Sequence, residues 1–293
     1  MKKILNLLLL LSLLFNLGCS TNSPNYVDFR TGSEGLSMRF LPYSPPSTIY
    51  NGDKVDFVLE LSNKGAYDIR GGKLSLTGFD KNIIKMYNDE FTFEKVEGKG
   101  EYNYQGEKLI IDQLIGTKIS LPEGVNQYNT PIEAIACYEY QTIASFPVCI
   151  DANPRVSKHD GCSVNDVSGS NQGGPIAVTH IDVEGGSGKM RHIITLKNVG
   201  GGELMNYNAC PYEYAYNNNN NINNYEVSIS GINLECQPGP SSLKMDDMGQ
   251  ARIYCKIDNL NENEAAYLTP ITIKLNYDYK DSTSTNVRIK GNI

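Results

Sequence analysis

YNTPIEAIACYEYQTIASFPVCI, residues 128–150, has a second version near the C-terminus, YLTPITIKLNYDYKDSTSTNVRI, residues 267–289. The two segments align without gaps at an offset of 139 residues, and they share a Thr-Pro-Ile triplet and a Tyr-x-Tyr motif. Two shorter pairs of segments repeat in the same order: LSNKG at 61–65 with LKNVG at 196–200, and SLTG at 75–78 with SISG at 228–231. We therefore interpret the chain as two diverged copies of one module.

The repeated segments have the pattern of β-strands. In the second copy, the apolar or aromatic residues at 271, 273, 275, 277 and 279 alternate with polar residues, which predicts one buried and one solvated face. In the first copy we expect a hairpin in which Tyr138 faces Val148 and residues 141–145 form the loop. The predicted fold class is all-β, with two tandem antiparallel β-sandwiches.

The N-terminus predicts export. Lys2 and Lys3 precede an apolar run at 4–17, which is typical of a signal peptide and too short to span a bilayer comfortably. The run ends in Leu-Gly-Cys-Ser, so that Cys19 occupies the lipidated position of a lipobox, although Asn16 departs from the bulky aliphatic residue usual there. The alternative is an ordinary exported protein cleaved near Gly18. We expect a lipid anchor to the membrane and a location on the extracellular face of the cell.

These observations divide the chain into five predicted segments. They are a signal peptide at 1–18, a lipidated tether at 19–30, a first β-sandwich module at 31–150, a disulfide-pinned linker at 151–174, and a second module at 175–293. The formal net charge is −7, and loss of the two leader lysines makes the mature chain more negative still. Because such a chain repels a phosphate backbone, nucleic acid is excluded as an expected partner.

Six cysteines remain once the lipobox cysteine is set aside, and an exported chain of this kind is expected to form three disulfides. A thiol at Cys137 could instead be reactive, but no neighbouring base or cation indicates this. Across the expected hairpin, Cys137 and Cys149 would share a face. The predicted disulfides are Cys137–Cys149, with Cys149–Cys162 as the alternative partner choice, Cys236–Cys255, and by elimination Cys162–Cys210.

An insertion in the second copy is the candidate ligand site. It contains NYNACPYEYAYNNNN, residues 206–220, and tyrosine and asparagine suit recognition surfaces because they supply rigid contact area and adaptable hydrogen bonds. A low-complexity loop without a binding role is the alternative interpretation. The candidate ligand residues are Tyr207, Tyr212, Tyr214, Tyr216 and Tyr225.

Signals for catalysis and for cofactors are weak. His159, His180 and His192 are far apart in sequence; the last two lie on the arms of an expected hairpin, where a two-histidine metal site lacks an obvious third ligand. The turn at 259–264 is rich in oxygen ligands but lacks the glycine and terminal glutamate of a calcium loop, so a solvated turn competes with a calcium site. We expect no catalytic residue, no metal and no cofactor.

The LSNKG and LKNVG segments and the final Tyr-x-Tyr strands resemble those of immunoglobulin-like domains of prokaryotic surface proteins, especially the cell-adhesion-related bacterial domain type. Paired modules behind a lipobox are also similar to bacterial and archaeal surface lipoproteins. The resemblance implies a sandwich fold and a non-enzymatic role in adhesion or in a cell-envelope assembly, with envelope proteins or glycans as partners. A glycan- or ligand-binding module that uses the tyrosine-rich insertion is the second hypothesis, and an enzyme with an unrecognised site is the third.

Overall fold

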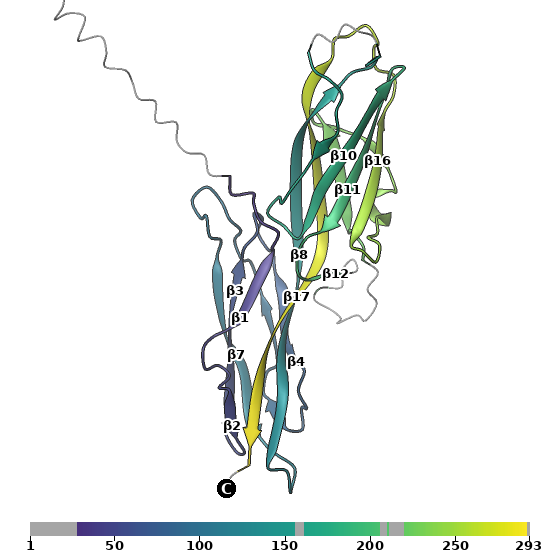
Figure 1. Cartoon of the computed structure of the whole chain (residues 1–293). Coiled ribbons are helices and arrows are strands. Elements are labelled where there is room, and N and C mark those ends of the chain that lie inside the picture. The colour runs from purple at the N-terminus through teal and green to yellow at the C-terminus, as the bar shows by residue number, and fades with distance from the viewer. Residues whose placement is uncertain (1–27, 156–160, 206–209, 211–219, 292–293) are drawn as a thin grey trace, which may run out of the picture.

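The computed structural model describes residues 28–155, 161–205, 210 and 220–291. The predicted signal peptide, the lipidation residue Cys19 and most of the predicted tether lie outside these residues, as does His159. The described chain forms two elongated lobes arranged end to end (Figure 1). Its regular structure is nearly all β-strand, which confirms the all-β prediction.

Two very long strands join the lobes. β8 (Gln127–Ile150) and β17 (Tyr267–Lys290) are the two repeated segments, and each contains 24 residues. They pair antiparallel along their whole length, from Tyr267 opposite Ile150 to Lys290 opposite Gln127. Both run from one lobe into the other (Figure 1). The expected hairpin with a loop at 141–145 is therefore wrong, because this segment continues straight and pairs with its own repeat.

The lower lobe holds the C-terminal end of β17 and packs two sheets together (Figure 1). One sheet has the order β1–β3–β7–β5, and the other uses β6, β4, β8 and β17, with β2 added to β17 in parallel. The strands are β1 (Leu36–Phe40), β2 (Thr48–Tyr50), β3 (Val55–Asn63), β4 (Gly72–Thr77), β5 (Ile84–Met86), β6 (Glu90–Phe93) and β7 (Lys108–Ile119).

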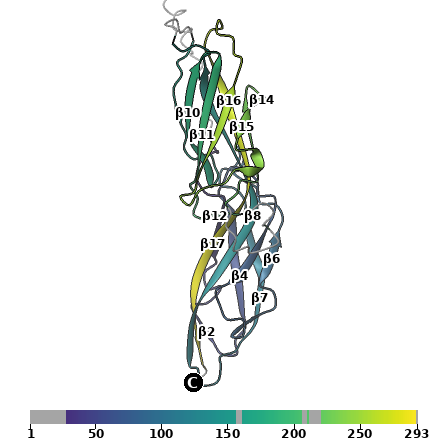
Figure 2. The ribbon, with the colours of Figure 1, turned by 90° about the vertical axis from the view of Figure 1, so that its right-hand side faces the viewer.

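The upper lobe also packs two sheets together. One has the order β15–β16–β11–β10–β9, and the other continues the β8–β17 pair with β13 and β14 (Figure 2). The short strand β12 pairs with β17 near the junction of the lobes. The elements are β9 (Val167–Ser168), β10 (Ile176–Gly186), β11 (Lys189–Asn198), β12 (Glu203–Leu204), β13 (Asn224–Ile229), β14 (Ile232–Asn233), β15 (Glu235–Gln237), the 3-10 helix η2 (Pro240–Ser242) and β16 (Gln250–Ile257).

The predicted modules share strands with each other. The first half of β8 pairs with β4 in the lower lobe, whereas residues 271–276 of β17 pair with β13 in the upper lobe. Glu139 lies opposite Asp278, and these two residues are also equivalent in the repeat alignment. The two copies are thus related by an approximate two-fold axis through this pair. The core face of β17 is as predicted, with the side chains of 271, 273, 275, 277 and 279 buried.

Three disulfides form, and one has the pairing first predicted. The preferred pairing of Cys137 with Cys149 is wrong, because both lie on one continuous strand and their separation is about 40 Å at 3.3 Å per residue. The alternative partner for Cys149 is the one observed. The disulfides are Cys137–Cys210, Cys149–Cys162 and Cys236–Cys255.

The pairing of Cys162 with Cys210 is wrong as well, because it was reached by elimination after the Cys137–Cys149 pair, and each of these two cysteines is bonded to a cysteine of β8 instead. Cys162 instead fastens the linker segment to the upper-lobe end of β8 through Cys149. Cys210 fastens the insertion to Cys137, close to the middle of β8. The linker is attached by a disulfide to the long strand β8, and not to the insertion as predicted. Three disulfides in one chain indicate that it matures in an oxidising, extracellular environment.

Candidate functional site

The junction of the lobes is organised around four tyrosine side chains. Tyr138 and Tyr140 lie on β8, opposite Tyr279 and Tyr277 on β17, so all four point to one face of the strand pair. Each side chain is buried, and neighbouring ring centroids lie 6.0–6.2 Å apart in edge-to-face or tilted orientations. Such contacts contribute about 0.5–1.5 kcal/mol each beyond the burial of their area. The tyrosines thus form the core of the junction.

The outer hydroxyl groups of this cluster, on Tyr140 and Tyr279, bind the backbone of the loops that follow β3 and β11, one loop in each lobe. Tyr140 Oη accepts a hydrogen bond from Tyr67 N at 3.3 Å, and Tyr279 Oη accepts one from Gly202 N at 3.0 Å. Tyr279 also donates to Asn198 Oδ1 at 2.9 Å. Asn198 is the last residue of β11 and the first residue of an Asn-x-Gly motif. Its side chain therefore links the turn predicted at this motif to the tyrosines of the junction.

The inner hydroxyl groups, on Tyr138 and Tyr277, also accept hydrogen bonds from the backbone. Leu36 N donates to Tyr138 Oη at 2.9 Å, and Ile176 N donates to Tyr277 Oη at 3.4 Å. Leu36 begins β1 and Ile176 begins β10, so each hydroxyl holds the first residue of a strand that follows a connecting segment. In each repeat, the first tyrosine of the final Tyr-x-Tyr motif therefore holds the start of a strand of its lobe, β1 in the lower lobe and β10 in the upper lobe.

The symmetry is broken at one pair of positions. Tyr277 Oη shares a hydrogen bond with Thr142 Oγ1 at 2.7 Å, whereas Tyr138 Oη donates to Asp281 Oδ2 at 2.6 Å. Thr142 and Asp281 are equivalent in the repeat. Burial raises the pKa of the Asp281 carboxyl to about 6, the Tyr138 hydroxyl opposes this shift, and the charge of Glu34 adds to it.

Asp281 lines an open pocket of about 360 Å³ between the lobes. Glu34 and the backbone of β1 form one side of the pocket, and Pro175, Gly200 and Gly201 form the other. The sequence did not single out Asp281, although the repeat alignment contained a signal: an acidic residue continues the buried alternation of β17 where the first copy has threonine.

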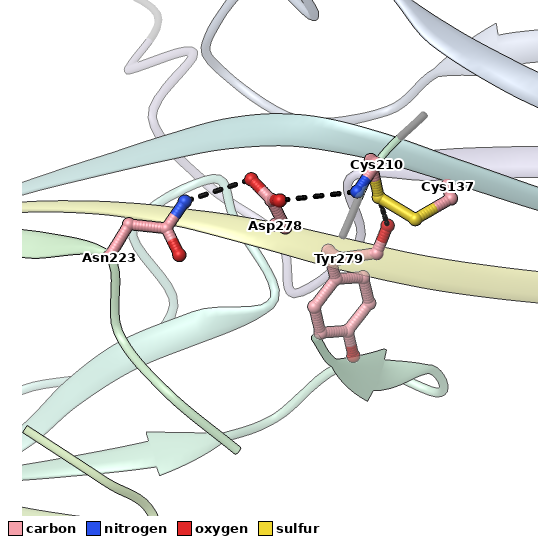
Figure 3. Close-up of a disulfide and its surroundings, with 5 residues drawn as sticks. All are labelled: Cys137, Cys210, Asn223, Asp278 and Tyr279. Carbon is pink, nitrogen blue, oxygen red and sulfur yellow. Dashed lines mark hydrogen bonds between the residues drawn. A yellow bond between two sulfur atoms is a disulfide. The ribbon is translucent and has the colours of Figure 1, made fainter. Parts of the chain in front are cut away.

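The disulfide of the insertion lies on the opposite face of the β8–β17 pair from the four tyrosines, because Cys137 is the neighbour of Tyr138 on β8. Asp278, at the centre of β17, accepts hydrogen bonds from Cys210 N at 3.4 Å and from Asn223 Nδ2 at 2.8 Å (Figure 3). Met205 N donates to the backbone oxygen of Asp278 at 2.9 Å. Both ends of the insertion, together with its cysteine, are therefore attached to the middle of the strand pair.

Of the five candidate ligand tyrosines, only Tyr225 lies within the described residues. Tyr207, Tyr212, Tyr214 and Tyr216 lie outside the described residues. Tyr225 is described; it lies in β13 with its side chain in the core, and its hydroxyl donates to the backbone oxygen of Pro238. Tyr225 is thus a core residue and does not belong to an exposed ligand surface.

The described histidines occupy different environments. The expected hairpin is present as β10 and β11, but His192 is fully buried and His180 is half-exposed. Neither ring nitrogen of His192 has a hydrogen-bond partner among the described residues, and burial lowers the pKa of His192 to about 4. His180 lies beside Asp166 and Asp182, a grouping that the sequence does not reveal, because Asp166 is 14 residues before His180 and reaches it only through the pairing of β9 with β10.

The acidic turn at 259–264 folds on itself. Asp258 at its start pairs with Lys256 at 3.0 Å, and the Asn261 side chain accepts the Asn263 backbone N–H and donates to Glu264. These contacts engage Asn261 and Glu264, two of the side chains that were candidates for calcium. The only cluster of three metal-ligating side chains within the described residues lies elsewhere, at Asp166.

No protein-family model matches the chain, and no curated protein matches it in sequence. Across residues 28–155, 161–205, 210 and 220–291, no helix is long and apolar enough to cross a membrane.

Proposed function

We propose that the protein is a non-enzymatic, lipid-anchored surface protein that acts as a stiff spacer in adhesion or in a cell-envelope assembly. The observation that carries this proposal is the β8–β17 pair, which is 24 residues long and passes through both lobes. A strand of this length spans about 80 Å at 3.3 Å per residue. Two lobes that share such strands are held in one orientation, whereas separate domains joined by a linker are expected to move relative to each other.

The junction supports the same role. The four tyrosines and their hydrogen bonds fix the chain segments that enter each lobe, and Cys137–Cys210 attaches the insertion to the opposite face of the strand pair. A spacer gains from such stiffness because it holds its distal end at a constant distance from its anchor. The immunoglobulin-like character of the lobes is part of this proposal, since both are two-sheet β structures.

The anchor and the assembly need separate tests. Cys19→Ser should release the protein from the membrane into the medium if this cysteine carries the lipid, and fractionation of the producing cells measures it. Cross-linking of intact cells without reductant, followed by mass spectrometry, should then join the protein reproducibly to itself or to other envelope proteins. Retention of the Cys19→Ser protein on membranes would contradict the anchor, and absence of cross-links from a surface-exposed protein would contradict the assembly.

A glycan- or ligand-binding role is the second candidate. It is favoured by the attachment of the insertion to Cys137 and to Asp278 at the middle of the molecule, because a recognition loop needs a fixed base. Replacement of residues 211–219 by a Gly/Ser segment of equal length retains Cys210 and β13. Binding on a glycan array that disappears with this replacement would support the second role. Unchanged cross-links in the same variant would leave the spacer role in place.

A further inference from the structure

A β-bulge changes which residues of β10 face the solvent. The pairing of β10 with β11 shifts register between Val178 and His180. Val178 is buried before the shift, and Ile181 and Val183 are buried after it. Without the extra residue, His180 would take the core-facing position, whereas with it His180 and Asp182 both point outward. Bulges are frequent where a strand redirects a side chain toward a functional site.

A second strand brings a third polar side chain to the same place. β9 pairs with β10, and the register continues so that Asp166, just before β9, comes opposite Asp182. Val183 N donates to Asp166 Oδ1 at 2.9 Å, which fixes this carboxylate. Four residues earlier, the Cys149–Cys162 disulfide ties the segment to β8. The position of Asp166 is therefore set by a covalent bond, by strand pairing and by a hydrogen bond.

The three side chains converge as metal ligands do. One ligand atom from each of Asp166, His180 and Asp182 lies within 4.8 Å of the other two. His180 Nε2 and Asp182 Oδ1 are 3.3 Å apart. This distance is slightly long for a hydrogen bond. It equals the edge of a tetrahedron whose metal–ligand bonds are about 2.0–2.1 Å, which gives an edge of roughly 3.3–3.4 Å.

Electrostatics also favours a cation here. Asp166 and Asp182 are like charges opposite each other on neighbouring strands, an arrangement that destabilises a sheet. Among the described residues, no lysine or arginine forms an ion pair with either carboxylate. A bound cation would remove the repulsion. Calcium and magnesium prefer ligand sets made only of oxygen, whereas an imidazole with two carboxylates suits zinc and related transition-metal ions.

We propose that Asp166, His180 and Asp182 bind a divalent transition-metal ion of the zinc type on the outer face of the upper lobe. Three protein ligands leave the fourth tetrahedral position for water or for a group from another molecule. The ion fastens the short edge strand β9 to β10. The site is independent of the junction and of the proposed spacer role.

Zinc binding to the full chain tests this proposal. The protein is produced in an oxidising compartment without a histidine tag, and Zn²⁺ is titrated against a chromophoric chelator at neutral pH. The expected result is one ion per chain. His180→Thr and Asp166→Asn should each weaken binding at least about 10-fold, because even residues that only support ligands change affinity 10–100-fold. The amide side chain introduced by Asp166→Asn retains an oxygen for the Val183 backbone N–H, which protects the fold of that variant.

A matched control separates the site from general surface charge. Asp258→Asn removes an exposed carboxylate from the same lobe that is already paired with Lys256, and it should leave the zinc affinity unchanged. Substitution by Co²⁺ should produce the visible absorption of a tetrahedral site, which His180→Thr should abolish. Zinc affinity that is the same in all four proteins, or a wild-type chain that takes up no zinc at 0.1 mM (on the order of weak surface binding), would overturn the proposal.

Discussion

Thr142 and Asp281 occupy equivalent positions on β8 and β17, and each hydrogen-bonds the inner tyrosine of the opposite strand. Thr142 is fully buried beside Gly174, whereas Asp281 is less buried and lines the pocket with Glu34. The same backbone and the same tyrosine contact thus accept a neutral hydroxyl on one side and an acid with a raised pKa on the other. The two repeats thus retain the same strand pairing and the same contact to tyrosine at the junction, but they differ in the charge of the side chain that makes this contact.

The largest effect is expected from removal of the tyrosines that both sides share. Tyr138→Ala and Tyr277→Ala should each lower the free energy of unfolding by about 3–5 kcal/mol, as for other buried aromatic side chains. Because each residue belongs to a strand that serves both lobes, both lobes should lose stability together. Calorimetry should show one transition at a lower temperature. Two separate transitions, of which only one moves, would contradict the shared core.

A reciprocal substitution tests whether the upper side tolerates charge. Thr142→Asp would place a carboxylate in a fully buried position beside Gly174, with only the Tyr277 hydroxyl as a donor. An uncompensated buried charge costs about 3–5 kcal/mol, so stability at pH 7 should fall by an amount of this order. Denaturant unfolding at pH 7 and at pH 4 measures the effect. The deficit should shrink at pH 4, where the carboxyl is protonated; Thr142→Asn is the neutral control.

His192 also makes stability depend on pH between 4 and 7, so it must be replaced before the contribution of Asp281 can be measured. Its folded-state pKa of about 4 lies below the ordinary 6.5, so the folded state binds fewer protons and loses stability as the pH falls from 6.5 toward 4. The maximum loss is about 3 kcal/mol at 1.36 kcal/mol per pKa unit. In His192→Leu this loss should disappear, as followed by urea unfolding between pH 4 and 7. If stability depends on pH in the same way in His192→Leu, a group other than His192 causes the loss.

The smallest expected effect concerns Asp281 itself. Its pKa is raised from 3.8 to about 6, so the folded state binds more protons and the protein loses stability as the pH rises from 3.8 to 6. Asp281→Thr, which copies the first repeat, should remove this slope and add on the order of 1 kcal/mol at pH 7, once solvent screening is allowed for. The experiment uses the His192→Leu background. A slope that persists would assign the titration to another carboxyl, with Glu34→Gln as the first check.

The sequence predicted the elements better than their partners. The alternation in residues 271–279 identified a strand and its buried face correctly, because that pattern is local. The hairpin and the Cys137–Cys149 disulfide were wrong because two cysteines that share a face fit one continuous strand as well as two paired arms. Nothing local shows that Gln141 hydrogen-bonds Asn276 on β17. β8 continues beyond one lobe because it pairs with β17 along its whole length, and this long-range pairing has no local signal in the sequence.

The candidate sites show the same limit. The tyrosine insertion was recognised by composition, and composition could not place Tyr225 in the core of β13. Asp166 is far in sequence from His180, and their approach depends on the bulge in β10 and on β9 pairing. The repeat alignment did contain the contrast between Thr142 and Asp281. Its meaning appears only when both are seen beside tyrosines of the opposite strand.

The shared strands also set an order of events during secretion. A chain that emerges from a translocation pore presents β8 long before β17, and until β17 follows, β8 has an unpaired edge across both lobes. Multidomain proteins commonly complete their N-terminal domain first. Here the upper lobe cannot close before the first half of β17 has left the pore, and the lower lobe cannot close before the second half has followed. The exposed edge of β8 invites pairing with other chains in the meantime. β17 is therefore the strand that completes the cores of both lobes.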